Sequence, residues 1–155
     1  MTSQKVFLTP EGYQKLYEEL QYLTTVRRAE IAKAIHDAKM DGDVMENAGY
    51  DEAKHQQAFV EGRIMTLQAM LENAVLIESD RPNDRVVLGS RVTVVEDGWE
   101  PETYTIVGSA EADPGAGRIS NESPLGKALM GHQPGDKVAF KTPEGTVEVQ
   151  ILRIE

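Results

Sequence analysis

The spacing of apolar residues divides the chain into a helical first part and a strand-rich second part. From Tyr13 to Ala38, apolar side chains recur mostly every three or four residues, which is typical of one face of an α-helix. A second stripe, from Ala53 to Ala74, steps by four and then three residues, the heptad spacing of a coiled coil. Between the stripes, Gly42 stands between two aspartates and predicts a turn. The pattern therefore predicts two antiparallel helices that pack along their apolar stripes.

The first predicted helix has a well-defined start. Thr9 is a suitable N-cap, and Pro10 fits the first helical position. Arg27 interrupts the first stripe, and Gln57 is the polar member of the second. At a rise of about 1.5 Å per residue, helices of about 30 residues each extend for about 45 Å. We expect a long hairpin with the Gly42 turn at its far end.

Short β-branched runs separated by glycine and proline fill the second part of the chain. Ser123 and Pro124 open a short predicted helix that ends before Gly131. A hairpin turn is predicted at Glu144–Gly145. The predicted strands span residues 86–95, 102–107, 137–141 and 146–154.

These elements predict an α+β chain with two domains. An antiparallel α-helical coiled-coil hairpin occupies residues 1–78, a polar linker residues 79–84, and a compact α+β domain residues 85–155.

Composition removes several classes of function. The net charge is −10, and both parts share the acidic excess, which argues against autonomous binding to duplex DNA. The chain has no cysteine, so a disulfide scaffold, a zinc ribbon and a thiol nucleophile are excluded. No apolar run approaches the roughly 18 residues of a membrane span, and the first residues show no signal-peptide core. We expect a cytoplasmic protein without membrane contact.

The predicted turn carries three carboxylates, those of Asp41, Asp43 and Glu46. The spacing of Asp43 and Glu46 matches a capping box at the start of the second helix. The same two carboxylates could share a hard cation through oxygen ligands, although two such groups do not hold Mg²⁺ firmly alone. Both interpretations remain open at this point, since a cap also fixes the direction of the carboxylates.

The turn and its flanks resemble the bacterial Gre transcript-cleavage factors, with the GreA branch most similar. The resemblance includes the segment Gly-Asp-Val-Met-Glu-Asn-Ala-Gly-Tyr at residues 42–50 and Leu-Thr-Pro-Glu-Gly at residues 8–12. It extends to Glu-Gly-Arg-Ile at residues 61–64 and Ser-Pro-Leu-Gly-Lys-Ala-Leu at residues 123–129. It therefore covers essentially the whole chain. Many relatives have an acid where this chain has Gly49, which could weaken metal affinity at the tip or reduce the stiffness of the helix start.

The resemblance implies a transcription elongation factor that acts on bacterial RNA polymerase. In this family the coiled coil enters the secondary channel of the polymerase, and the C-terminal FKBP-like domain docks at the channel rim. Asp43 and Glu46 would help the polymerase hold Mg²⁺ and cut backtracked nascent RNA at its 3′ end. The chain would be an accessory factor without a complete active site, a monomer, and in contact with DNA only through the polymerase complex.

The resemblance also assigns contacts outside the acidic pair. Lys39, Lys54 and Tyr50 match positions that contact the RNA 3′ segment, while solvated lysines and a packing tyrosine are the simpler interpretations. A second group, in the predicted helix start of the C-terminal domain, matches the polymerase-docking loop; there an N-cap role for the serine explains the residue equally well. This group consists of Glu122, Ser123 and Pro124.

Three other functions compete with transcript cleavage. A channel-blocking inhibitor of RNA polymerase could share the fold, although the spacing of Asp43 and Glu46 favours cleavage. A prolyl isomerase needs an aromatic-lined pocket, and the second part offers only three aromatic residues, Trp99, Tyr104 and Phe140. A coiled-coil chaperone would have an apolar tip. The histidines, His36, His55 and His132, lie at no convincing metal-ligand spacing, so we expect exposed helix positions for the first two and a loop position for the third.

Overall fold

The computed structural model describes residues 4–41, 47–78 and 80–155. It divides into two compact units, one formed by residues 13–73 and the other by residues 1–12 and 74–155. The first is a helical hairpin, hereafter the hairpin, and the second is built on a five-stranded sheet, hereafter the sheet unit. The predicted fold class, an α+β chain with a helical hairpin before a C-terminal sheet domain, is confirmed.

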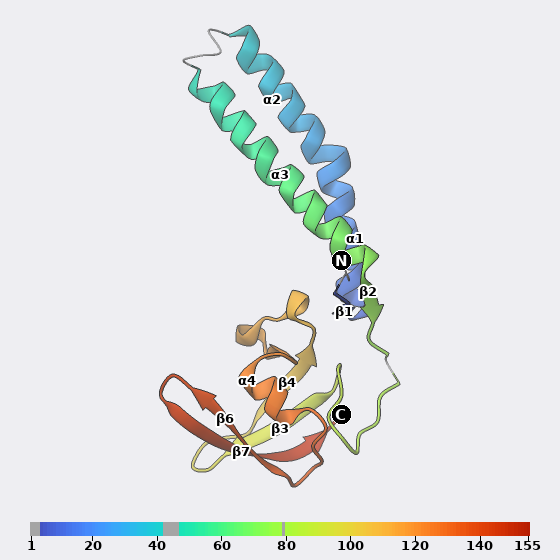
Figure 1. Ribbon diagram of the computed structural model, residues 1–155, viewed down its shortest axis with the longest axis vertical. Coiled ribbons are helices and arrows are strands. Elements are labelled where there is room, and N and C mark those ends of the chain that lie inside the picture. The colour runs from blue at the N-terminus through green and yellow to red at the C-terminus, as the bar shows by residue number, and fades with distance from the viewer. Residues whose placement is uncertain (1–3, 42–46, 79) are drawn as a thin grey trace. The chain divides into compact units, whose positions relative to one another are not determined.

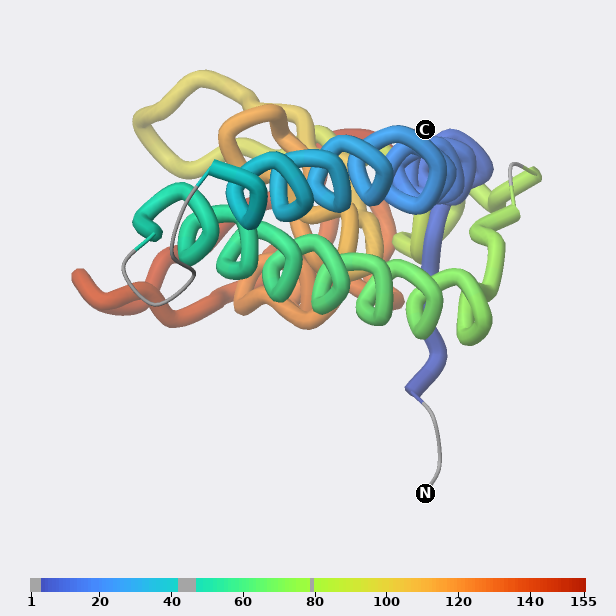
Figure 2. The backbone as a smooth tube through the Cα atoms, turned by 90° about the horizontal axis from the view of Figure 1, so that it is seen from above, coloured from blue at the N-terminus to red at the C-terminus, as the bar shows by residue number. Residues whose placement is uncertain are grey.

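The hairpin contains α1 (Pro10–Tyr22) from Tyr13 onward, a π-helical segment (Leu23–Arg27), α2 (Arg28–Met40) and α3 (Ala48–Glu72). α2 and α3 lie side by side along their lengths (Figures 1 and 2). Their seam buries Ile31 against Val60 and Ile64. These residues belong to the two predicted stripes, so the heptad pattern identified the packing face correctly.

The π-helical segment explains the interruption at Arg27. Leu23 and Ile31 both pack in the seam although eight residues separate them, one more than a heptad. A π-helical turn takes up one extra residue and so returns both side chains to the same face. The hydroxyl of Thr25 donates a hydrogen bond of 2.6 Å to the carbonyl of Gln21. This side-chain bond competes with the backbone hydrogen bonds of a regular α-helix.

The sheet of the second unit has the strand order β5-β4-β3-β7-β6. Its strands are β3 (Arg91–Glu96), β4 (Glu102–Val107), β5 (Arg118–Ser120), β6 (Lys137–Thr142) and β7 (Gly145–Ile154). β5 is parallel to β4, and the other neighbouring pairs are antiparallel. The core lies beneath α4 (Pro124–Leu129), where Leu129, Ile106 and Ile151 are fully buried.

Two local predictions in the sheet unit were wrong. The strand predicted at residues 86–95 begins only at Arg91, because Gly89 has a φ of 91° and the Ser90 hydroxyl accepts a hydrogen bond from the Val87 amide, which together form a turn. The β6–β7 connection lies one residue earlier than predicted, since Thr142 pairs with Gly145 across Pro143 and Glu144.

The two segments that flank the hairpin in sequence pair with each other as short strands. β1 (Val6–Leu8) is parallel to β2 (Ala74–Leu76), and both strands belong to the sheet unit. The predicted domain boundaries at residues 78, 79–84 and 85 follow the order of the chain, whereas the compact units do not. The sequence pattern had assigned Ala74 to the end of the helical stripe, but α3 ends at Glu72.

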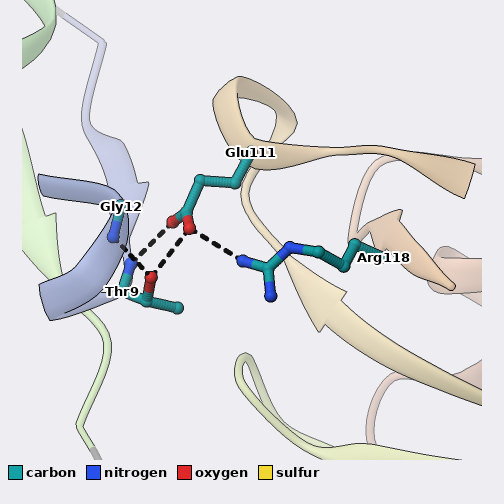
Figure 3. A network of polar contacts seen from close by, with 4 residues as sticks. All are labelled: Thr9, Gly12, Glu111 and Arg118. Carbon is teal, nitrogen blue, oxygen red and sulfur yellow. Dashed lines mark hydrogen bonds and ion pairs between the residues drawn. The ribbon is translucent and has the colours of Figure 1, made fainter. Parts of the chain in front are cut away.

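A polar network fixes the first turn of α1 within the sheet unit (Figure 3). The carboxylate of Glu111 accepts hydrogen bonds of 2.7 Å from both the amide and the hydroxyl of Thr9, and one of 2.8 Å from Arg118. The same Thr9 hydroxyl accepts from the Gly12 amide at 3.0 Å, which confirms Thr9 as the predicted N-cap. Glu111 thus connects the N-cap of α1 to a segment 102 residues away within the same unit.

Candidate functional site

The described residues on both sides of the hairpin turn form the first part of the candidate site. α2 ends at Met40, and α3 begins at Ala48 with Asn47 as its N-cap. The side chain of Asn47 accepts a hydrogen bond of 3.0 Å from the Tyr50 amide and donates one of 2.5 Å to the Ala38 carbonyl. One asparagine therefore caps α3 and connects it to the end of α2.

The predicted tip carboxylates, Asp43 and Glu46, lie outside the described residues. The cap of α3 is Asn47, so the capping box predicted for the start of this helix does not describe its N-cap. The sequence analysis did not identify Asn47 as the N-cap, because the capping box predicted at Asp43 placed Asn47 inside the helix. Within the described part of the chain, no cluster of three or more histidine, aspartate or glutamate side chains could hold a metal ion.

Two of the three predicted RNA-contact residues lie together. The ammonium group of Lys39, in the last turn of α2, lies 5.8 Å from the centre of the Tyr50 ring, within the range of a cation–π contact. Lys54 lies one turn further along α3, where its ammonium donates a hydrogen bond of 2.9 Å to Gln57. Lys39 and Lys54 are exposed and Tyr50 is half-buried. The two helices thus present a basic and an aromatic group beside the turn.

The predicted docking residues lie together at the start of α4. The Ser123 hydroxyl accepts a hydrogen bond of 3.1 Å from the Gly126 amide and donates one of 2.6 Å to the Ser120 carbonyl. Pro124 occupies the first helical position, and the Glu122 carboxylate accepts from the Ser109 hydroxyl at 2.9 Å. The N-cap role of Ser123 is confirmed, while the docking role of the three residues stays a prediction.

Gly126 allows this helix start to approach the sheet. A Cβ at that position would lie only 1.9 Å from the backbone carbonyl oxygen of Ser120. Because the neighbouring atom is backbone, a larger residue would have to push α4 away from β5. The position and direction of the Glu122–Pro124 segment therefore depend on a glycine within the same motif.

The histidines occupy the places expected from the sequence. His36 and His55 are exposed on helices, and His132 lies in a loop, where its Nδ1 is 3.2 Å from the Asp136 carboxylate. The Asp136 carboxylate also accepts a hydrogen bond from the Gln133 amide, and this bond, more than the one to His132, lowers the pKa of Asp136. This cluster stabilises a turn before β6.

Two family models together span almost all of the chain. The model described as the N-terminal part of transcription elongation factors matches residues 6–76, and the GreA/GreB C-terminal model matches residues 81–155. The chain belongs to the GreA/GreB family of transcription elongation factors. The resemblance seen in the turn and its flanks is thereby confirmed.

Individual relatives agree with the family. The chain is 53% identical to the transcription elongation factor GreA of Thermoanaerobacter pseudethanolicus over 154 residues, which cover 98% of each protein. It is 52% identical to the Bacillus subtilis factor GreA over 157 residues, with 99% of each protein covered. Among solved structures, the GreA factor homolog 1 of Thermus thermophilus is 32% identical, with 98% of this chain and 99% of that chain covered and a TM-score of 0.44.

The relatives named GreA favour one of the predicted functions over another. Close relatives from several bacteria carry the name of an elongation factor, so the alternative of a channel-blocking inhibitor is not favoured. Within the described part of the chain, no helix has both the length and the apolar character needed to cross a membrane.

Proposed function

We propose that this chain binds bacterial RNA polymerase and stimulates the polymerase's own cleavage of backtracked nascent RNA. The single observation that carries the proposal is the family match, which includes both the hairpin and the sheet unit. The chain acts as an accessory factor, because its contribution is a pair of carboxylates offered to an active site that belongs to the polymerase.

The hairpin suits the delivery of side chains to a confined site. The 25 residues of α3 extend for about 37 Å at the rise of an α-helix. Its seam is narrow. α2 ends at Met40 and α3 begins at Ala48, and the sequence between them contains Asp43 and Glu46. A long two-helix probe can therefore bring its terminal segment into a channel too narrow for a globular domain.

Asp43 and Glu46 would supply oxygen ligands to Mg²⁺ shared with the polymerase. Carboxylates are the side chains that Mg²⁺ prefers, and a pair of them is insufficient to hold it without further ligands. When bound, the ion would activate water and stabilise the leaving oxygen during phosphodiester hydrolysis. The role of the chain is to place the two carboxylates beside the scissile bond.

Lys39, Tyr50 and Lys54 would hold the RNA 3′ segment close to that bond. The two ammonium groups can neutralise phosphates, and the Tyr50 ring offers a surface for a base. The contact between Lys39 and Tyr50, at 5.8 Å, keeps these two groups adjacent across the two helices. The Glu122–Pro124 segment at the start of α4 would provide docking to the rim of the channel.

The test uses a purified bacterial RNA polymerase walked into a backtracked state. With Mg²⁺ present, we expect the wild-type chain to release short 3′ RNA fragments, and Asp43→Asn and Glu46→Gln to lose this stimulation while still binding the polymerase. The matched control is Asp37→Asn, which removes one exposed carboxylate from α2 outside the turn. Normal cleavage with either tip variant would refute the ligand role.

Docking is tested separately by competition for the polymerase. Pro124→Ala should weaken binding without altering the fragments released at saturating concentration, because Pro124 is not near the reacting atoms in this proposal. Unchanged competition by Pro124→Ala and by Glu122→Gln would leave only the structural role of the segment. Slowed elongation without fragment release would instead support the inhibitor.

A further inference from the structure

The sheet unit contains a pocket lined by aromatic side chains. Trp99 from the β3–β4 connection, Tyr104 from β4 and Phe140 from β6 line a cavity of about 100 Å³. The sequence offered these three aromatic residues without indicating that they would meet. Trp99 is 71% exposed, an unusual state for an indole in a unit that has a well-formed core elsewhere. The apolar remainder of the lining consists of Val94, Leu125, Val147 and Val149.

Carboxylates line the same pocket. Glu96 ends β3, Glu102 begins β4, and Glu100 lies in the connection between these two strands. The Tyr104 hydroxyl donates a hydrogen bond to Glu102. Burial, together with this bond and the nearby carboxylates, raises the pKa of Tyr104 to about 12, so the hydroxyl remains a neutral donor that holds Glu102 in place.

The acidic character continues beyond the pocket. A second hollow of about 330 Å³ shares Glu96 and Trp99 with the first and adds the carboxylates of Asp97 and Glu148. Lys137 is the basic side chain in the lining of this second hollow. A ligand that enters beside Trp99 therefore meets a surface with an excess of negative charge.

The size and chemistry of the pocket select its occupant. Pockets for cofactors and drug-sized ligands have volumes of about 300–1,000 Å³, so a cavity of about 100 Å³ accommodates a single side chain. Aromatic faces attract cations, and carboxylates pair with them. An arginine fits both requirements better than a lysine, because its planar guanidinium stacks on a ring while its N–H groups bind carboxylates in pairs.

We propose that the pocket between Trp99, Tyr104 and Phe140 binds one arginine side chain from an exposed segment of a protein partner. The guanidinium stacks against the aromatic rings, and Glu100 and Glu102 accept its hydrogen bonds. The aliphatic part of the arginine packs against Val94, Val147 and Val149. This site belongs to the sheet unit and does not require the cleavage activity proposed for the hairpin.

The single tryptophan of the chain provides a direct test. The probes are three blocked pentapeptides, Gly-Ala-X-Ala-Gly, in which X is arginine, its neutral isostere citrulline, or proline. Titration of the full chain is followed by Trp99 fluorescence and by the indole N–H resonance. We expect saturable binding of the arginine peptide with a Kd on the order of 1 mM or tighter, and at least tenfold weaker binding of the other two.

Substitutions of the pocket carboxylates test whether the Trp99 response comes from binding in the pocket. Glu102→Gln combined with Glu100→Gln should weaken the arginine peptide at least tenfold while citrulline binding stays the same. Glu144→Gln, on the exposed β6–β7 connection, is the matched control and should bind as the wild type does. An unchanged Trp99 emission spectrum in the free variants shows that the pocket is intact.

Three results would overturn the proposal. Equal affinity for arginine and citrulline would show that charge is not recognised. Tighter binding of the proline peptide would indicate a pocket of the prolyl-isomerase type. No saturable response to the arginine peptide up to about ten times the expected Kd would show that the pocket is not a side-chain site. None of these results depends on RNA cleavage, so the proposal can fail while the proposed function stands, and the reverse.

Discussion

The hairpin and the sheet unit differ in how their side chains stabilise them. The sheet unit has a continuous core between its sheet and α4, in which Ile106, Leu129 and Ile151 have no exposed surface. The hairpin buries a single line of side chains, centred on Ile31 and Ile64. Because two helices can cover only one face of each other, most of the hairpin surface remains in contact with solvent.

Ion pairs between the helices supplement the narrow seam. Arg28 pairs with Glu61 at 2.7 Å, and Arg63 pairs with Glu19 at 2.8 Å, in both cases with two hydrogen bonds between guanidinium and carboxylate. Exposed pairs contribute little individually, and salt screens them. The hairpin therefore combines a narrow buried seam with ion pairs on its surface, whereas the sheet unit relies on buried packing.

The largest expected effect comes from truncating one buried isoleucine in each unit. Ile106→Ala should reduce the free energy of unfolding of the sheet unit by about 4 kcal/mol, and Ile64→Ala should cost the hairpin about 2.5 kcal/mol, because a single seam collapses around a cavity more easily than a closed core. Urea unfolding measures both, with Trp99 fluorescence reporting on the sheet unit and the helical circular dichroism signal mainly on the hairpin. Equal losses would contradict the distinction between the two kinds of packing.

An intermediate effect is expected from Glu111, which is only 10% exposed and accepts hydrogen bonds from Thr9 and Arg118. Glu111→Gln should lower the free energy of unfolding of the sheet unit by about 1–2 kcal/mol, because it removes the charged acceptor of the bonds from Thr9, the N-cap of α1, and from Arg118. Hydrogen exchange at the amides of Thr9 and Gly12 should accelerate. Glu144→Gln serves as the control for loss of an exposed charge, and unchanged exchange at Thr9 in Glu111→Gln would show that the network is dispensable.

The sequence predicted elements with a strong period better than contacts between distant segments. The seam residues Val60 and Ile64 were identified because their spacing depends only on helix geometry. The β1–β2 pair was missed, since two three-residue strands have too few positions for alternation to be recognised. Glu111 was missed for the same kind of reason, as its partner Thr9 is 102 residues away.

The candidate site shows the same limit. Motif and resemblance indicated Lys39 and Tyr50, and the structure shows the two in contact. The convergence of Trp99, Tyr104 and Phe140 could not be predicted, because it depends on which strands are neighbours in the sheet. The presence of only three aromatic residues in the second part argued against an aromatic-lined pocket, yet all three line one.

Acid should affect the hairpin more than the sheet unit. Hydrogen bonds from Arg63 and Arg28 lower the pKa values of Glu19 and Glu61 below their ordinary value of 4.5. The stabilisation is therefore complete above about pH 4.5 and is lost as the pH falls through the lowered pKa values of the folded state. In the sheet unit Asp136 behaves in the same direction, through its bonds to the Gln133 amide and His132.

Thermal melts between about pH 7 and about pH 3 measure this difference. As the pH falls, the melting temperature followed by the helical signal should decrease more than the one followed by Trp99 fluorescence. Over the same range, the melting temperature of the double variant Glu19→Gln, Glu61→Gln should decrease less than that of the wild type. Addition of salt at neutral pH should reduce the gap between wild type and double variant. A double variant as acid-sensitive as the wild type would show that other carboxylates govern the hairpin.

The smallest effect tests whether α3 is optimised for stability along its exposed face. Gly62 lies in the interior of this helix, and a Cβ added there meets no atom of the described chain within 4 Å. Gly62→Ala should therefore raise the free energy of unfolding of the hairpin by about 0.5–1 kcal/mol, because alanine has less backbone freedom to lose. Gly49→Ala should gain less, since its Cβ would lie 3.3 Å from the Asn47 side-chain oxygen that caps α3. The melting temperature followed by the helical signal should rise for Gly62→Ala, while the transition followed by Trp99 fluorescence stays unchanged. A loss of stability would mean that the exposed face of α3 has less space around Gly62 than its contacts indicate.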